Sequence, residues 1–140
     1  MGKVQILAVL TMDGCLSSEL YDKAHQDLCL DRCGLDEIRE KALYHVTPVY
    51  SISMLREWRK DGTNIRYLAE ATPDTSDYIN GLLRMHAVDE IILYTVPFIA
   101  GTGRHFFKSA LPEQHWTLSS LKSYSNGVCR IIYILDKKAR

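Results

Sequence analysis

The chain has 140 residues, 46% of them hydrophobic, and its 17 basic residues balance its 17 acidic ones. A chain of this length can bury about two-thirds of its unfolded surface, and we expect residues 1–140 to form a single domain. Neutral charge without a basic block argues against a general role in binding nucleic acid or a membrane surface. No stretch is apolar for long enough to span a membrane.

The N-terminus and the cysteines indicate a reducing compartment. The first residues, MGKVQIL, lack the long apolar core and the small-residue cleavage site of a signal peptide. The four cysteines, at positions 15, 29, 33 and 129, form no Cys-x-x-Cys pair, and the histidines offer no zinc-binding spacing beside them. We therefore predict a cytoplasmic protein with reduced thiols and without a metal site.

The first strand is predicted at Lys3–Leu10, because its apolar run is nearly unbroken, as in strands buried in the middle of a sheet. A turn follows at residues 11–14, where Gly14 is free to adopt a positive φ. Asp13 in this turn has two interpretations. It is either a turn residue, since Asp-Gly is common in tight turns, or a carboxylate at the mouth of the central strands that can bind a polar heterocycle.

Two short helices and an irregular strand are expected next. Ser17 or Ser18 can cap the first helix, and residues 36–44 repeat the helical spacing of apolar residues. Residues 46–53 mix β-branched and aromatic side chains with Pro48, which cannot donate to a sheet ladder. This composition predicts an edge strand or a short irregular one.

A helix, a strand and a longer helix follow. Ser53 can cap a helix over residues 54–60, and alternating apolar residues predict a strand over residues 64–70. The longer helix begins after the segment ATPD at residues 71–74 and ends near Ala87. Its buried stripe is predicted to consist of Ile79, Leu82, Leu83 and His86.

Residues 91–96 form an apolar, β-rich run without clean alternation, which is typical of a strand covered on both faces. Pro97 weakens regular pairing at its end. Gly101 and Gly103 then bracket a tight loop. A central strand that opens into such a loop is where open α/β sheets bind ligands.

The C-terminal part is predicted to be a hairpin. Residues 115–124 and 127–136 are joined through Ser-Asn-Gly, and Asn-Gly between apolar runs is a strong hairpin signal. The last strand is apolar on both faces, so we expect it inside the sheet. The order of elements predicts an α/β fold with three layers: a mostly parallel sheet flanked by helices, with an antiparallel C-terminal hairpin.

Two stretches resemble the dihydrofolate reductase-like family, and most closely its riboflavin-biosynthesis reductase branch. Residues 4–14 are similar to the family's first strand and the apolar-x-Asp-Gly turn that follows it. The other match is the pattern of acidic residues, apolar strand, proline, Gly-x-Gly and aromatic residue, carried by Asp89, Glu90, Pro97, Gly101, Gly103 and Phe107.

The resemblance implies a reductase that transfers hydride from NADPH to a pterin- or pyrimidine-like substrate, with the cofactor carrying the reaction. The substrate would lie beside Asp13, close to residues 71–72 and 99–103. The cofactor would be bound along Ala8, Leu10, Thr72, Thr75, Ser76, Gly101, Thr102 and Gly103. The resemblance also implies a homodimer that buries part of the C-terminal sheet.

The sequence departs from the family at the expected cofactor site. The family has a Gly-Gly pair between a strand and a helix, where backbone N–H groups receive the pyrophosphate. The matching junction here has no glycine, and Pro73 removes one donor. Glu70, Asp74 and Asp77 add negative charge there, and residues 44–52 lack the glycine and arginine of the family's second phosphate segment.

Three hypotheses therefore stay open: a reductase with a modified cofactor site, a member of the fold that binds a ligand or a partner without hydride transfer, or an unrelated α/β protein. NADPH is the cofactor of the first hypothesis. If Pro73 and the acidic side chains occupy the phosphate position, the second hypothesis is favoured over the first.

Overall fold

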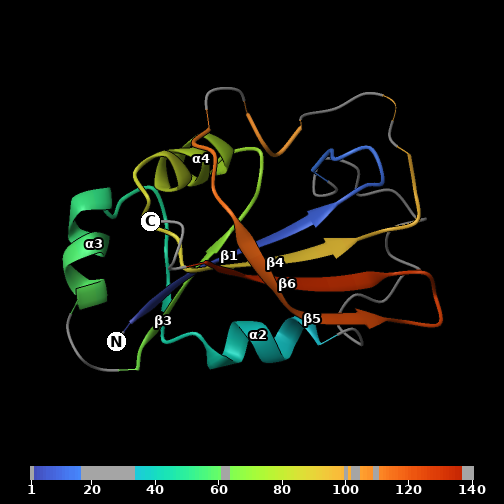
Figure 1. The fold of residues 1–140 in the computed structure, drawn as a ribbon, viewed down its shortest axis with the longest axis horizontal. Helices are drawn as coiled ribbons and strands as arrows, with labels where there is room; N and C mark the ends of the chain where they lie inside the picture. Colours follow the sequence, from blue (N-terminus) through green and yellow to red (C-terminus); the bar gives the residue numbers. More distant parts are fainter. Residues whose placement is uncertain are drawn as a thin grey trace.

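In the computed structural model, the residues that can be described are 2–16, 34–60, 64–99, 101, 105–108 and 111–136. They contain a six-stranded sheet of order β2-β3-β1-β4-β6-β5 (Figure 1). Its strands are β1 Lys3–Leu10, β2 Tyr44–His45, β3 Arg66–Glu70, β4 Glu90–Thr95, β5 Trp116–Ser123 and β6 Cys129–Leu135. The helices are α2 Leu35–Lys41, α3 Ile52–Lys60 and α4 Ser76–Arg84.

The strand directions confirm the predicted mixed sheet. β1 pairs in parallel with both β3 and β4, and β2 pairs in parallel with β3. β6 lies between β4 and β5 and is antiparallel to both, so the last strand is inside the sheet as predicted. At the hairpin turn the N–H of Gly127 donates to the carbonyl of Tyr124, and Gly127 has φ +89°, which favours glycine.

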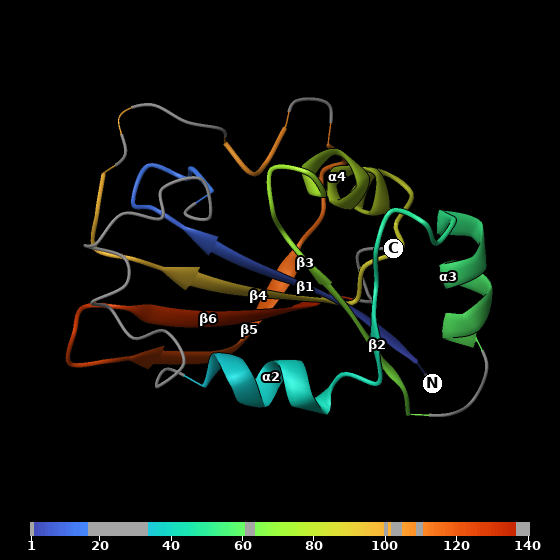
Figure 2. The same cartoon turned by 180° about the vertical axis from the view of Figure 1, so that it is seen from behind.

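Helices cover both faces of the sheet and complete the three layers (Figures 1 and 2). α3 and α4 pack on one face, where Leu55 and Ile79 join Ile6 in one hydrophobic core. α2 lies on the other face, where Leu35 packs in a second core with Ile92. β4 thus sends Ile91 into the first core and Ile92 into the second, which explains why its sequence is apolar without alternation.

The predicted elements between β1 and β3 needed correction. The helix predicted at residues 36–44 ends at Lys41, because Ala42 is extended and Tyr44 pairs with Tyr67 of β3. The edge strand is therefore β2, and residues 46–53 were assigned to a strand wrongly. Their backbone turns at Pro48 after the N–H of Val46 donates to the carbonyl of Leu68. The helix predicted after Ser17 or Ser18 lies outside the described residues.

Two helix ends also differ from prediction. α3 begins at Ile52, and its cap is Ser51 and not Ser53, because the Ser51 hydroxyl accepts the N–H of Met54 at 3.1 Å. α4 ends at Arg84 and not near Ala87. His86 follows in the left-handed region, with φ +54°, and its side chain is exposed, so its predicted place in the buried stripe was wrong. The reversal at His86 instead turns the buried Ala87 back toward the core.

None of the described helices is long and apolar enough to cross a membrane.

Candidate functional site

The carboxyl ends of the parallel strands β1, β3 and β4 meet at one edge of the sheet, as the sequence predicted. β3 ends first, because its last residue, Glu70, pairs with Leu7, whereas β1 continues to Leu10, which pairs with Thr95 of β4. The N–H of Ala71 donates to the carbonyl of Leu7 at 2.7 Å, and the chain then leaves the sheet toward α4. The loops after β1 and β4 therefore project beyond the start of α4.

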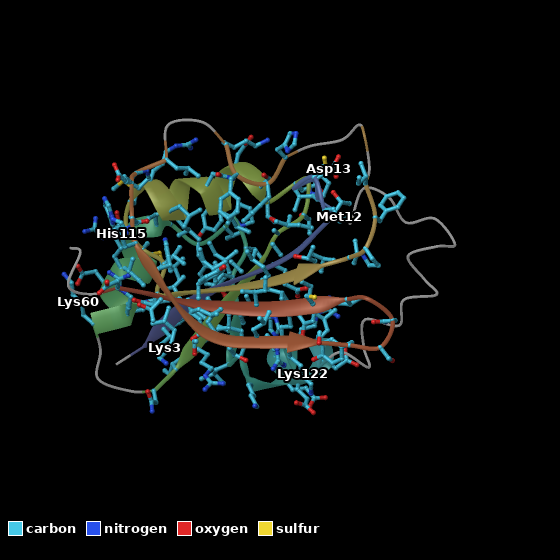
Figure 3. All side chains as sticks on the ribbon, turned by 45° about the vertical axis from the view of Figure 1, so that its right-hand side comes forward. Lys3, Met12, Asp13, Lys60, His115 and Lys122 are labelled. Atoms are coloured by element: carbon cyan, nitrogen blue, oxygen red, sulfur yellow. The ribbon has the colours of Figure 1, made fainter. Side chains whose placement is uncertain are left out.

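Asp13, labelled in Figure 3, lies in the loop after β1 and bonds to the loop after β4. One carboxylate oxygen accepts the Thr11 hydroxyl, and the other accepts the N–H of Gly101 at 3.0 Å. The N–H of Met12 donates to the carbonyl of Phe98 at 2.8 Å and reinforces the contact between the loops. The expectation that Asp13 lies beside residues 99–103 is confirmed at Gly101, although the two residues are far apart in sequence.

The geometry of Asp13 agrees with both of its interpretations. It belongs to a tight turn, since the N–H of Gly14 donates to the carbonyl of Thr11 at 3.0 Å and the Thr11 hydroxyl accepts the N–H of Cys15 at 3.1 Å. Its side chain is also only half-buried, so the carboxylate borders the solvent at the ends of the central strands. A carboxylate accepts hydrogen bonds of the kind that the N–H groups of a polar ring donate.

The start of α4 is stabilised by two threonines that bond to each other's backbone. The N–H of Thr72 donates to the Thr75 hydroxyl at 2.8 Å, and the N–H of Thr75 donates to the Thr72 hydroxyl at 3.2 Å. The Thr75 hydroxyl in turn donates to the carbonyl of Glu70 at 2.8 Å. Thr72 and Thr75 were both predicted to line the cofactor path, and in the structure their hydroxyls bond within the chain.

A pyrophosphate therefore does not fit this helix start. Pro73 has no N–H, and the N–H groups of Thr72 and Thr75 already have acceptors. Asp74 is exposed just before α4, and Asp77 lies in its first turn, so both carboxylates would repel an anion. One feature points the other way: the hydroxyl oxygen of Ser76, a residue only 2% exposed, has no hydrogen-bond partner among the described residues.

The remaining predicted cofactor residues divide into two groups. Ala8 and Leu10 are 1% and 7% exposed and their side chains belong to the core on the α4 face, so a ligand could reach them only through the backbone. Gly101 is exposed and has φ +75°, and a Cβ added there would meet no atom within 4 Å. Thr102 and Gly103 lie outside the described residues.

Asn80 is a site-forming residue that the sequence analysis missed. Its side chain is fully buried and donates to the carbonyls of Ser76 and Phe106, both at 2.8 Å. Its oxygen accepts the N–H of Lys108 at 3.0 Å. Asn80 thereby fixes the segment after the Gly101 loop to α4. The sequence offered one signal for this role, because Asn80 follows Ile79 of the predicted buried stripe and a buried amide needs hydrogen-bond partners.

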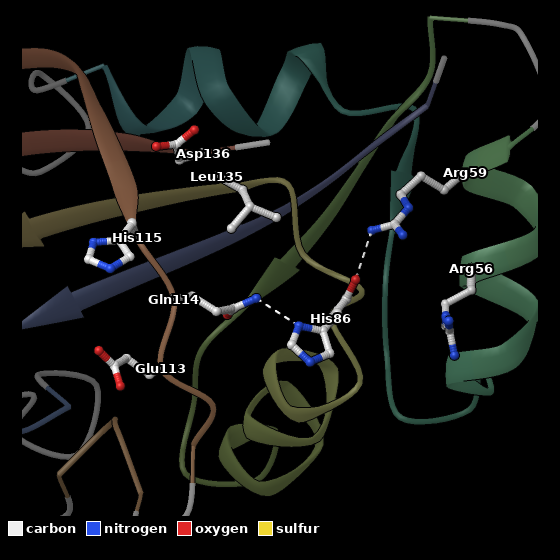
Figure 4. A pocket seen from close by; sticks show the side chains of 8 residues that line it. All are labelled: Arg56, Arg59, His86, Glu113, Gln114, His115, Leu135 and Asp136. Carbon is white, nitrogen blue, oxygen red and sulfur yellow. Dashed lines mark hydrogen bonds between the residues drawn. The ribbon is translucent and has the colours of Figure 1, made fainter. Parts of the chain in front are cut away.

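One hollow among the described residues lies away from this edge. It has a volume of about 410 Å³ and lies between α3, the end of α4 and residues 113–115 (Figure 4). There Arg59 donates to the carbonyl of His86 at 3.2 Å and lies 3.5 Å from Asp89, while Gln114 bonds to the His86 ring at 2.9 Å. We keep the Asp13 edge as the candidate site, because it joins the loops that follow two central strands.

The architecture defines a class of fold, the mixed α/β fold of solved structures of riboflavin-biosynthesis proteins, as the two sequence stretches predicted. No protein-family model matches the chain, and neither does the sequence of any curated protein. The likeness lies in solved structures, and at their low sequence identity it shows the fold.

Two of these structures are similar over nearly the whole chain. A riboflavin biosynthesis protein from Shewanella sp. PV-4 is 12% identical with a TM-score of 0.61, and the match covers 96% of this chain and 99% of that one. RibD from Acinetobacter baumannii is also 12% identical with a TM-score of 0.61, and the match covers 97% of this chain and 58% of RibD. The chain thus spans somewhat more than half the length of that RibD.

Proposed function

We propose that this chain binds a flat, polar heterocycle of the pyrimidine or pterin kind beside Asp13, on a reductase-like fold whose usual pyrophosphate position is closed. The observation that carries this proposal is the reciprocal pair of hydrogen bonds between Thr72 and Thr75 at the start of α4. The pair uses the N–H groups that a dinucleotide phosphate would need there.

The charge around α4 supports the same conclusion. A helix N-terminus attracts anions because its N–H groups are unpaired and its dipole is positive there. Here Pro73 removes one N–H, and Asp74 and Asp77 already supply negative charge. A dianionic pyrophosphate would gain few hydrogen bonds and meet two carboxylates, so we expect no NADPH binding in the family's manner.

The kind of ligand follows from Asp13. A half-buried carboxylate held between two loops accepts hydrogen bonds and does not donate them when ionised. Pyrimidines and pterins present N–H and amino groups on one edge of a flat ring, which matches such an acceptor. Gly101 bonds to Asp13 and has open space where a Cβ would lie, so a ring bound to Asp13 can approach the loop closely.

A second candidate function is the NADPH-dependent reduction of such a ring. The unpartnered Ser76 hydroxyl favours it, since a buried hydroxyl without an acceptor is uncommon in folded proteins and a phosphate oxygen could fill that role. Under this alternative the chain would have to bind the cofactor along a path that avoids Pro73.

The two candidates are separated by ligand-dependent melting and by NADPH fluorescence. A ligand that binds only the native state raises the melting temperature as its concentration rises. We expect a pterin or a pyrimidine to raise it, NADPH to leave it unchanged, and Asp13→Asn to weaken the heterocycle effect. A saturable change in NADPH fluorescence, with oxidation of NADPH when a heterocycle is added, would contradict the proposal and support the reductase.

We also propose that two copies of the chain pair through the C-terminal part of the sheet. Leu118 and Leu121 of β5 are 52% and 63% exposed. In register they lie beside Tyr133 and Ile131 of β6, and Ile131 lies beside Leu93 of β4, so these side chains share one face. A second copy of this apolar face is the occupant we expect, in a protein of the cytoplasm.

A further inference from the structure

Another hollow, with a volume of about 240 Å³, lies on the opposite face of the sheet from α4. α2 and the strands β1, β3, β4 and β6 contribute to its walls. Three of its lining side chains are cationic: Lys41 at the end of α2, Arg66 at the start of β3 and Arg130 in β6. It shares no lining residue with the Asp13 edge, and the proposed function makes no use of it.

The unusual feature of this hollow is the guanidinium of Arg130. Its Nε atom is buried and has no hydrogen-bond partner among the residues that the structure describes. Within the described part of the chain, no carboxylate pairs with Arg130 either. Removing an N–H group of a guanidinium from water costs free energy unless a hydrogen-bond acceptor compensates for it. Such a group calls for a partner that the described residues do not supply.

The backbone at Gly34 lies close to the guanidinium of Arg130 and leaves little room for a side chain between them. Gly34 has φ +81°, and a Cβ added there would lie 3.2 Å from the Nη1 atom of Arg130. The hydroxyls of Tyr124 and Tyr94 would lie 3.7 and 3.8 Å from that Cβ. The guanidinium is thus enclosed where α2 begins, while Lys41 lies at the other end of the helix.

The surrounding charges leave this hollow with an excess of cations. Its acidic lining residues are Glu37, which is exposed on α2, and Glu90, whose carboxylate accepts the Gln5 amide at 3.3 Å. Neither makes an ion pair with a described cation. Lys41 and Arg66 also have no ion-pair partner in the described ranges, so three cations face two carboxylates.

We propose that the hollow under α2 binds a small oxyanion, a phosphate or phosphate-monoester group, with Arg130 as its main ligand. The planar guanidinium donates two parallel N–H bonds to such a group. Lys41 and Arg66 contribute charge at the margin. A volume of about 240 Å³ accommodates a phosphate with a small organic substituent.

The test measures the melting temperature of the full chain against inorganic phosphate and against glycerol phosphate. Sodium chloride replaces the anion at constant ionic strength, so that general salt effects cancel. We expect a saturable rise in the wild-type chain and none in Arg130→Met, with the affinity at least about tenfold weaker in the variant. The exposed Arg56, which belongs to α3 on the other face of the sheet, provides the matched control: Arg56→Met should respond like the wild type.

Each outcome decides the proposal. A rise with either anion that depends on Arg130 supports it, and the two anions tell whether a bare phosphate suffices or an ester is needed. Absence of a saturable rise with both anions, or an equal rise in Arg130→Met, would overturn it. If Arg130→Met does not fold, Lys41→Gln and Arg66→Gln replace it, because both side chains belong to exposed residues. Their combined substitution should then weaken binding, and an unchanged affinity would overturn the proposal.

Discussion

Replacing Asn80 with leucine tests whether the amide fixes the segment after the Gly101 loop to α4. The side chain makes three hydrogen bonds, at 2.8, 2.8 and 3.0 Å, and is fully buried. Leucine has a similar volume but no polar atom. The substitution leaves the carbonyl of Phe106 and the N–H of Lys108 without these partners.

The expected loss of stability follows from those two groups. An unsatisfied buried backbone group costs about 1–3 kcal/mol. Phe106 is fully buried, whereas Lys108 is partly exposed and its N–H can recover part of the loss from water. We therefore expect the free energy of unfolding to fall by about 2–4 kcal/mol in Asn80→Leu. For a domain of this size the melting temperature should fall by roughly 6–16 °C.

Urea unfolding monitored by tryptophan fluorescence measures this change, since the chain has two tryptophans, Trp58 and Trp116. The matched control is Asn64→Leu, because Asn64 is exposed and its substitution should change stability by less than about 0.5 kcal/mol. Hydrogen exchange at the Lys108 amide should accelerate in Asn80→Leu. Equal stability of the two variants would refute the role given to Asn80.

Three further predictions concern other parts of the molecule. Leu121→Asp should shift the chain from dimer to monomer in light scattering, because it places a charge in the apolar face of β5; an unchanged dimer mass would contradict the proposed interface. Asp13→Ala should cost about 1–3 kcal/mol in urea unfolding, since Thr11 and Gly101 lose a shared acceptor; a loss no greater than that of an exposed aspartate would contradict this. Burial raises the pKa of Tyr78 above its ordinary value of 10.0, so the folded chain holds the phenol proton more tightly than the unfolded chain. This contribution to stability is complete below about pH 10 and is lost as the pH rises through the folded pKa, and Tyr78→Phe should remove that part of the pH dependence of the urea midpoint.

The sequence alone was sufficient for the central strands and the hairpin. β1 and β4 are apolar on both faces because helices cover both sides of the sheet. A strand that is buried on both faces has a nearly continuous run of apolar residues, which can be read from the sequence. The hairpin was predictable because its tight turn requires a residue with a positive φ, and the sequence places Gly127 at that position between two apolar strands. From these elements and two short motifs, the class of fold followed.

Other features were decided only by the tertiary structure, because their partners are distant in sequence. β2 is two residues long and lies where β3 offers a free edge, so its place could not be derived from its own residues. His86 has the spacing of a buried residue, but the helix ends before it. Gly101 bonds to Asp13, and Asn80 bonds to the segment that follows the Gly101 loop. Both contacts form because the fold brings segments together that are distant in sequence. Periodicity records which side of an element is buried, whereas hydrogen-bond partners depend on where the rest of the chain passes.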